Sequence, residues 1–351
     1  MNLLFLFFIS SGLFLGWSLG ASDASNIFGT AIATRMIRFK TAAIIASIFI
    51  IIGSVHAGAG GATTLGQLGS INTLAGAFMA SLAAAIAICW SVKISMPVST
   101  SQAIVGAIIG WNFYAGKPTN YAILSKIVST WIFCPILAAI TAIILYKIIQ
   151  YHCKKSNIHL IRRDQYTRIG LIIAGAFGAY ALGANNIANV MGVFVPASPL
   201  KALTLPILDI SFNKSQVLFF LGAIAISAGI FTYSHKVIKT IGNSIMKMSP
   251  LMAFVVVISQ ALVLFLFSSQ ELFNFLQSHN LPTIPLVPVS STQAVVGAVL
   301  GIGIAKGGNE INWSVLGKII LSWVIAPVLS ALICYISLFF LQNVFNMVVY
   351  K

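Results

Sequence analysis

The chain has 351 residues, of which 59% are hydrophobic and 7% charged, and its mean hydropathy is +0.99. Soluble domains usually carry about a quarter of charged residues, so this composition argues against a soluble protein and indicates a polytopic membrane protein. The net charge of +15 does not indicate nucleic-acid binding, because the basic residues fall in short connectors between apolar runs. We therefore expect an integral, multi-pass protein of the cell (plasma or inner) membrane, with the lipid bilayer and no nucleic acid as partner.

At about 20 residues per crossing, the chain holds roughly ten apolar membrane segments, the first of which is too long for one simple span. Five precede a polar, basic connector and five follow it; they lie near 2–34, 41–56, 71–92, 96–115, 122–149, 168–200, 216–235, 250–268, 284–305 and 313–345. The first run has no basic residues ahead of its apolar core and leads straight into a polar motif, which favours a membrane segment over a cleaved signal peptide. Re-entrant hairpins in place of some full spans are an open alternative.

The two halves of the chain share three sequence blocks in the same order. The matches are LGASDASNIFG (19–29) with LGANNIANVMG (182–192), PVSTSQAIVGAIIG (97–110) with PVSSTQAVVGAVLG (288–301), and SKIVSTWIFCPIL (125–137) with GKIILSWVIAPVL (317–329). Because five crossings per half is an odd number, the second half should be inverted in the membrane. We predict an all-α membrane protein of two inverted repeats, 1–149 and 168–351, joined by a cytoplasmic basic connector at 150–167.

The basic residues predict the orientation of the chain in the membrane. With five crossings in each half, fifteen of the twenty Lys and Arg residues fall on one face, and the other face holds only those at 117, 126, 201, 214 and 351. The positive-inside rule then makes the first face cytoplasmic and places the N-terminus outside. Lys93, a few residues before one of the repeated blocks, is interpreted as part of this charge pattern, because its counterpart Ile284 is uncharged.

Asp23 lies inside the first apolar segment and is one of only five acidic residues in the chain. A carboxylate at mid-membrane costs roughly 3 kcal/mol even on insertion scales, and such residues are usually functional. Small polar residues compete with helical hydrogen bonds, so we expect helix breaks near the midplane at GASDASN (20–26) and GANNIAN (183–189). A Na⁺ ion or a proton would then bind the oxygen atoms of Asp23, Asn26, Asn186 and Asn189. The plainer alternative is that these side chains only join helix ends across the bundle.

The two PVS blocks predict an anion site. Proline is favoured in the first turn of a helix, where hydroxyl groups and free backbone N–H groups form an anion-binding cup. The first cup comprises Ser99, Thr100, Ser101 and Gln102, and the second Ser290, Ser291, Thr292 and Gln293. Many donors with little positive charge suit an oxyanion such as phosphate. The alternative is ordinary packing of small polar residues between transmembrane helices.

These motifs resemble those of the inorganic phosphate transporter (PiT) family. GASDASNIFGTA and GANNIANVMG are similar to its GANDVANA-type repeats, and both PVS blocks are similar to its PVSTTHAIVG-type blocks. The resemblance spans both halves in order and implies an all-helical, often dimeric transporter that carries phosphate with Na⁺ or H⁺; some relatives carry sulfate. It places Asp23 and Asn26 on the acidic and final asparagine positions of the first repeat, and Asn189 on the final asparagine of the second.

The chain departs from the family pattern at four positions. Ser22 stands where the family has asparagine, and Asn186 stands where it usually has aspartate, so one expected carboxylate is missing. Gln102 and Gln293 replace the usual histidines, which removes two groups that titrate near neutral pH. The glutamines favour Na⁺ over H⁺ as the coupling ion, although Asp23 alone can carry a proton.

The sequence predicts a secondary active transporter that imports inorganic phosphate by Na⁺ symport through alternating access. A proton-coupled phosphate or sulfate permease of the same fold is the alternative, and an anion channel is a further one that would need no coupling carboxylate. No nucleophile–base pair, metal cluster or cofactor motif indicates an enzyme. We therefore expect no cofactor beyond the coupling ion, and a homodimer is compatible with this interpretation.

Overall fold

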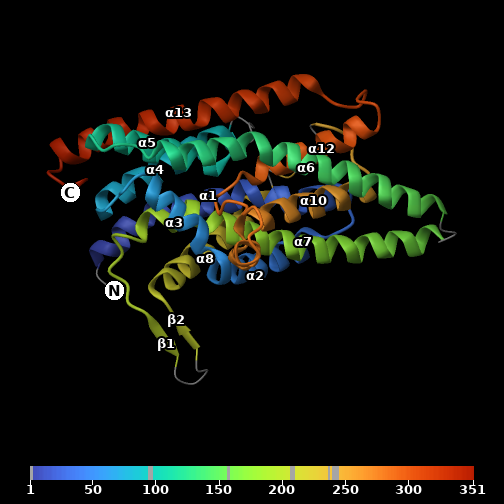
Figure 1. The fold of residues 1–351 in the computed structure, drawn as a ribbon, viewed down its shortest axis with the longest axis horizontal. Helices are drawn as coiled ribbons and strands as arrows, with labels where there is room; N and C mark the ends of the chain where they lie inside the picture. The colour runs from blue at the N-terminus through green and yellow to red at the C-terminus, as the bar shows by residue number, and fades with distance from the viewer. Residues whose placement is uncertain (1–2, 94–97, 156–158, 206–209, 236–237, 239–244) are drawn as a thin grey trace.

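The computed structural model describes residues 3–93, 98–155, 159–205, 210–235, 238 and 245–351. Pro97 of the first PVS block, and Lys236 and Lys239 of the charge count, lie outside these residues. The described helices are α1 (Leu3–Ala33), α2 (Phe39–Ala57), α3 (Ala59–Leu68), α4 (Leu74–Lys93), α5 (Thr100–Ala115), α6 (Tyr121–Lys155), α7 (Leu160–Met191), α8 (Lys214–Thr232), α10 (Pro250–Ser268), α11 (Gln270–Ser278), α12 (Ser291–Ala305) and α13 (Trp313–Asn343). Strands β1 (Leu203–Leu205) and β2 (Ile210–Phe212) form an antiparallel hairpin that projects from the helices (Figure 1).

The predicted all-α membrane fold is confirmed, and each of the ten predicted segments contains a helix. Eight helices within the described residues are long and apolar enough to cross a membrane: α1, α2, α4, α6, α7, α8, α10 and α13. The other two predicted segments are the short helices α5 and α12, of 16 and 15 residues. Each begins directly after a serine in extended conformation, with ψ of 117° at Ser99 and 114° at Ser290.

The predicted helix breaks at GASDASN and GANNIAN are wrong, because α1 and α7 run through both motifs without interruption. The serine side chains there bond within the helix: the Ser25 hydroxyl donates to the Ser22 carbonyl (2.5 Å), and the Ser22 hydroxyl donates to the Leu19 carbonyl (3.3 Å). The helical backbone is therefore kept, and the extended backbone lies instead at the PVS blocks.

Helix pairs across the two halves contact each other in matching ways. Helix α1 packs against α8 as α7 packs against α2, and α5 packs against α13 as α12 packs against α6. At the first two crossings the backbones nearly touch, since a Cβ at Gly20 would collide with the Ile226 carbonyl and one at Gly183 with the Ile50 carbonyl. Gly20 and Gly183 are matched positions of the sequence repeat, so the repeat extends to the tertiary contacts.

The bundle has two distinct ends along its long axis (Figure 1). Both chain termini lie at one end, here called the terminal end, and the close approach of α6 and α7 marks the other, here called the connector end. The predicted connector at 150–167 is made largely of helix, because α6 continues to Lys155 and α7 begins at Leu160. Helix α1 starts at the terminal end and α7 at the connector end, an arrangement compatible with inverted repeats. The Arg168 side chain, near the start of α7, donates to the Met36 carbonyl just beyond α1 (2.8 Å).

Candidate functional site

The N-termini of α5 and α12 meet α1 and α7 in one buried polar cluster. All the predicted cation-site and anion-site residues are buried in it: Asp23, Asn26, Asn186, Asn189, Ser99, Thr100, Ser101, Gln102, Ser290, Ser291, Thr292 and Gln293. The largest exposed fraction among them is 7%, at Asn26. The structure thus joins into one site the two sets of residues that the sequence treats separately.

Asp23 lies between the two PVS blocks. Its Oδ2 accepts from the Ser291 hydroxyl at 3.0 Å and from the Thr100 hydroxyl at 3.4 Å, and its Oδ1 accepts from the Ser22 hydroxyl at 3.0 Å. Thr100 and Ser291 are matched positions of the repeat, so one carboxylate oxygen contacts both blocks. Among the described residues no Lys, Arg or His forms an ion pair with Asp23. Only hydroxyl groups therefore offset its charge, and a cation or a proton would complete the site.

The final asparagine of each helix motif contacts the PVS block of the other half. The Asn26 Nδ2 donates to the hydroxyls of Ser291 (3.3 Å) and Thr292 (3.2 Å). The Asn189 Nδ2 donates to the Ser101 hydroxyl at 2.9 Å. These bonds connect α1 to α12 and α7 to α5, so the two halves of the chain are joined at the site.

Asn185 is a site residue that the sequence analysis missed. Its Nδ2 donates to the Val289 carbonyl at 2.7 Å, and its Oδ1 accepts from the Val289 N–H at 3.0 Å. This pair of bonds fixes the extended chain before α12 to α7. The family pattern could have identified Asn185, because the pattern has asparagine both at this position and at the one that Ser22 occupies. Ser22 instead bonds to Asp23, and in the first half the Val98 carbonyl accepts only from the Thr292 hydroxyl (3.2 Å) among the described side chains.

The hydroxyl groups of the two predicted cups are engaged within the protein. Ser99 and Ser290 cap their helices, accepting from the backbone N–H groups of Gln102 (3.3 Å) and Gln293 (3.2 Å). The Ser101 hydroxyl donates to the Val289 carbonyl at 3.0 Å. A bound anion must therefore replace the Val289 carbonyl before Ser101 can donate to it, and must replace Asp23 at Thr100 and Ser291. The Ser99 and Ser290 hydroxyls only accept in these contacts.

Four buried polar atoms of the cluster have no partner among the described residues: Gln102 Oε1, Gln293 Oε1, Asn189 Oδ1 and Asn186 Nδ2. A buried polar atom without a hydrogen bond costs about 1–3 kcal/mol, so such atoms are places where a ligand gains affinity. Three of the four are oxygen atoms, which are ligands for a hard cation or acceptors for an O–H group. The two glutamines were predicted to donate to an anion. Their unpaired oxygen atoms can instead accept a hydrogen bond or bind a cation.

A small cavity adjoins the cluster beside α1 and α12. It has a volume of about 40 Å³ and is lined in part by Asn26, Thr30, Thr292 and Met246. That volume holds only a few water molecules and is too small for phosphate in this conformation. Met246 precedes α10, whose first residues lie near the start of α7, so the cavity lies on the connector side of the cluster.

Comparisons with known proteins agree along nearly the whole chain. The family model described as "Phosphate transporter family" matches residues 19–272 and 280–350. A protein named as a phosphate permease in Methanocaldococcus jannaschii is 30% identical over 324 residues, covering 92% of this chain and 93% of the relative. A protein named as a low-affinity inorganic phosphate transporter in Bacillus subtilis is 27% identical over 333 residues, covering 93% of each. A solved structure titled "The sodium-dependent phosphate transporter" has a TM-score of 0.72 and 22% identity, and covers 96% of this chain and 100% of that one.

Proposed function

Because the chain belongs to the phosphate transporter family, and is thus a membrane transporter rather than an enzyme, we propose that it imports inorganic phosphate by Na⁺ symport and alternating access. The observation that carries this proposal is the bonding of Asp23. Its Oδ2 accepts hydroxyl groups from both PVS blocks, and no described basic side chain offsets its charge. An anion that enters this cluster is therefore repelled by the negative charge of the Asp23 carboxylate.

The coupling of cation and anion follows from that repulsion. A cation at Asp23 offsets the carboxylate and competes with Thr100 and Ser291 for its oxygen atoms. The released hydroxyl groups can then donate to phosphate oxygens. Binding of the cation thereby creates the anion site, which makes transport of one depend on the other.

The unpaired side-chain oxygens support Na⁺ as the ion and phosphate as the anion. Gln102 Oε1, Gln293 Oε1 and Asn189 Oδ1 are neutral hard ligands that do not titrate near pH 7. A glutamine oxygen can also accept from the O–H group of a protonated phosphate. Sulfate carries no such proton near neutral pH, so acceptors in the site favour phosphate.

Alternating access is supported by the position of the cavity and by the bonds on the opposite side. The cavity beside Asn26 lies toward the connector end. Toward the terminal end, the Thr64 hydroxyl donates to the Leu286 carbonyl at 2.6 Å, and Asn185 holds Val289. We infer that this conformation faces the connector end, which is cytoplasmic if the N-terminus lies outside. Inversion of the two halves would let matching segments of the other half close the connector end in the opposite conformation.

The experiment that tests this function is uptake of radiolabelled phosphate into proteoliposomes under an inward Na⁺ gradient. A proton gradient without Na⁺ is the control for the coupling ion, and excess unlabelled sulfate is the control for the anion. We expect accumulation above equilibrium that needs Na⁺ and survives sulfate. Uptake driven by the proton gradient alone would indicate a proton-coupled permease. Suppression by sulfate would indicate a sulfate permease, and uptake that never exceeds equilibrium would indicate an anion channel.

A further inference from the structure

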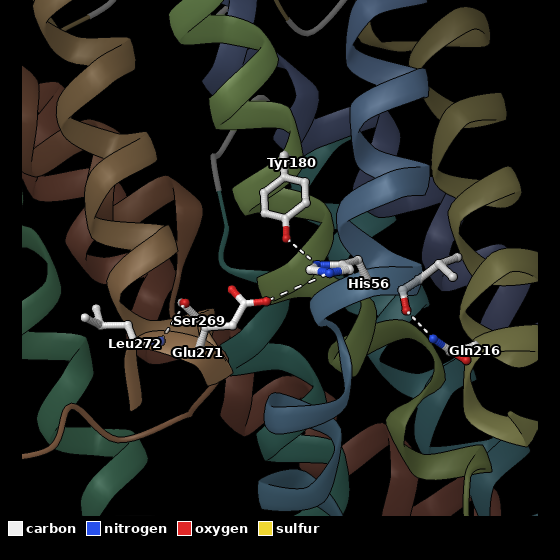
Figure 2. A network of polar contacts seen from close by, with 7 residues as sticks. His56, Tyr180, Gln216, Ser269, Glu271 and Leu272 are labelled. Atoms are coloured by element: carbon white, nitrogen blue, oxygen red, sulfur yellow. Dashed lines mark hydrogen bonds and ion pairs between the residues drawn. The ribbon is translucent and has the colours of Figure 1, made fainter. Parts of the chain in front are cut away.

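Helices α1 and α7 each form a groove with two neighbouring helices. Helix α1 lies between α4 and α8, and α7 lies between α10 and α2. In the first groove the Trp17 Nε1 donates to the Thr232 hydroxyl at 2.8 Å. In the second the Tyr180 hydroxyl lies 2.8 Å from His56 Nδ1 (Figure 2). Trp17 and Tyr180 stand three residues before Gly20 and Gly183, so the two aromatic contacts are equivalent in the repeat.

In the second groove, the chain itself brings an acidic side chain toward His56. Helix α11 follows α10 directly and is capped by Ser269, whose hydroxyl accepts from the Leu272 N–H at 3.1 Å. Glu271 extends from α11 toward His56, with Oε1 3.9 Å from Nε2 (Figure 2). This groove therefore receives an acidic group from within the molecule.

Among the described residues, no equivalent segment brings an acidic side chain to the first groove. Only residues 94–99 separate α4 from α5, whereas residues 269–290, including α11, separate α10 from α12. The groove contains a cavity of about 270 Å³ whose apolar lining includes Phe14, Trp17, Ile88 and Val92. Lys93 is the single charged residue among the described residues that line it. No described acidic side chain forms an ion pair with Lys93.

We propose that this groove binds an anionic phospholipid, with the headgroup phosphate at Lys93 and an acyl chain along Phe14, Trp17 and Val92. The apolar lining suits a hydrocarbon chain and excludes a hydrated free phosphate ion. Phe14 is 37% exposed on a membrane-spanning helix, so the cavity is open to the bilayer. Lys93 is the last residue of α4, and its long side chain can extend from the helix end toward the headgroups. Basic pockets between transmembrane helices bind acidic headgroups. The lipid supplies to Lys93 the negative charge that Glu271 supplies to His56.

Cys89 is a natural reporter of this site. It lines the cavity, with its Sγ 3.2 Å from the Ser18 hydroxyl, whereas Cys153 lies near the connector end of α6. The test is alkylation of the purified full chain by N-ethylmaleimide in nanodiscs of phosphatidylcholine, with and without phosphatidylglycerol, followed by peptide mass spectrometry. We expect phosphatidylglycerol to slow alkylation of Cys89 about threefold or more relative to Cys153, because a bound lipid covers the thiol. Equal relative rates in both lipids would overturn the proposal.

Three exposed-lysine variants separate the charge of Lys93 from general effects of lipid charge. Lys93→Gln should lose the protection of Cys89 and Lys93→Arg should keep it. Lys318→Gln removes a lysine of α13 that does not line the cavity and should leave the protection unchanged. Protection that persists in Lys93→Gln would contradict the headgroup contact. Protection by inorganic phosphate in nanodiscs of phosphatidylcholine alone would assign the groove to the free anion and overturn the lipid.

Discussion

The two PVS blocks are nearly identical in sequence, yet the structure holds them differently. The second block is fixed to α7 by the two bonds between Asn185 and Val289, while the first has Ser22 at the equivalent position and no such contact with α1. The start of α12 should therefore move with α7. Among the described side chains, the start of α5 is joined to α1 only by the 3.4 Å bond from Thr100 to Asp23, so it can part from α1 when a cation displaces that bond. A repeat of sequence is thus no guarantee of equal mobility in the two halves.

The two halves also differ in charge at the site. Asp23 and Asn186 are matched positions, but Asp23 accepts hydroxyl groups from both PVS blocks. Among the described residues, Asn186 Oδ1 accepts only from Asn185 (3.1 Å) and Asn189 (3.0 Å) of its own helix. In the proposed mechanism, the first half therefore carries the coupling charge and the second half supplies neutral ligands.

The largest effect is expected from removing the coupling charge. Asp23→Asn should lower Na⁺-driven phosphate accumulation by about a hundredfold or more, because no cation is then required to offset the carboxylate. The measurement is accumulation in proteoliposomes, with Asp164→Asn, an exposed acid in the first turns of α7, as the control. The exchange Asp23→Asn with Asn186→Asp should not restore accumulation, since position 186 contacts neither Thr100 nor Ser291. Restoration by the exchange would show that the two halves are equivalent after all.

Asn185→Ser gives the second half the residue type of the first. It should destabilise the protein by about 1–3 kcal/mol, because the Val289 N–H and carbonyl lose their buried partner. The change is measured as a lowered midpoint of thermal unfolding in detergent, together with the phosphate KM. Asn274→Ser, on exposed α11, is the matched control. An unchanged midpoint would mean that the two bonds between Asn185 and Val289 do not stabilise the second block.

Ser22→Asn is the converse change and gives the first half an amide that can reach Val98. A net hydrogen-bond gain of about 1 kcal/mol shifts a two-state equilibrium about fivefold, so we expect the maximal uptake rate to fall by about that factor. Thermal stability should rise or stay constant, which separates this slowing from damage to the fold. Faster uptake in this variant would contradict the idea that the first block must part from α1.

The smallest effect is expected from Gln102→His and Gln293→His, which return the residue type typical of the family. Histidine ordinarily gains its proton near pH 6.5. Below that pH the added positive charge repels the cation at Asp23, so uptake should fall by about two- to threefold relative to the unmodified chain as pH is lowered. Uptake is compared between pH 5.5 and pH 8, with the unmodified chain correcting for the ionisation of phosphate itself. A constant ratio across this range would place both side chains away from the cation.

The apolar segments and the residues of the polar cluster could be predicted from the sequence, because both follow from local sequence patterns. Segment lengths follow from membrane thickness, and two copies of one motif identified the polar cluster. The helix breaks were predicted wrongly, because the reason for a glycine at position 20 lies in another helix. The Ile226 carbonyl of that helix occupies the space that a side chain at position 20 would fill. The bond between Asn185 and Val289 spans 104 residues and leaves no local pattern. The single cluster of cation and anion residues likewise arises from how α5 and α12 enter the bundle.

The length of α6 and α7 has a practical use in imaging. At 1.5 Å per residue, the 35 residues of α6 span about 50 Å, against about 30 Å for the hydrocarbon core of a bilayer. The surplus would carry the ends of α6 and α7 beyond the hydrocarbon core at the connector end, where Lys154, Arg162 and Arg163 lie. A soluble helical bundle spliced in register onto both helices would stand rigidly outside the micelle. Electron micrographs of a small transporter would then contain a landmark for particle alignment.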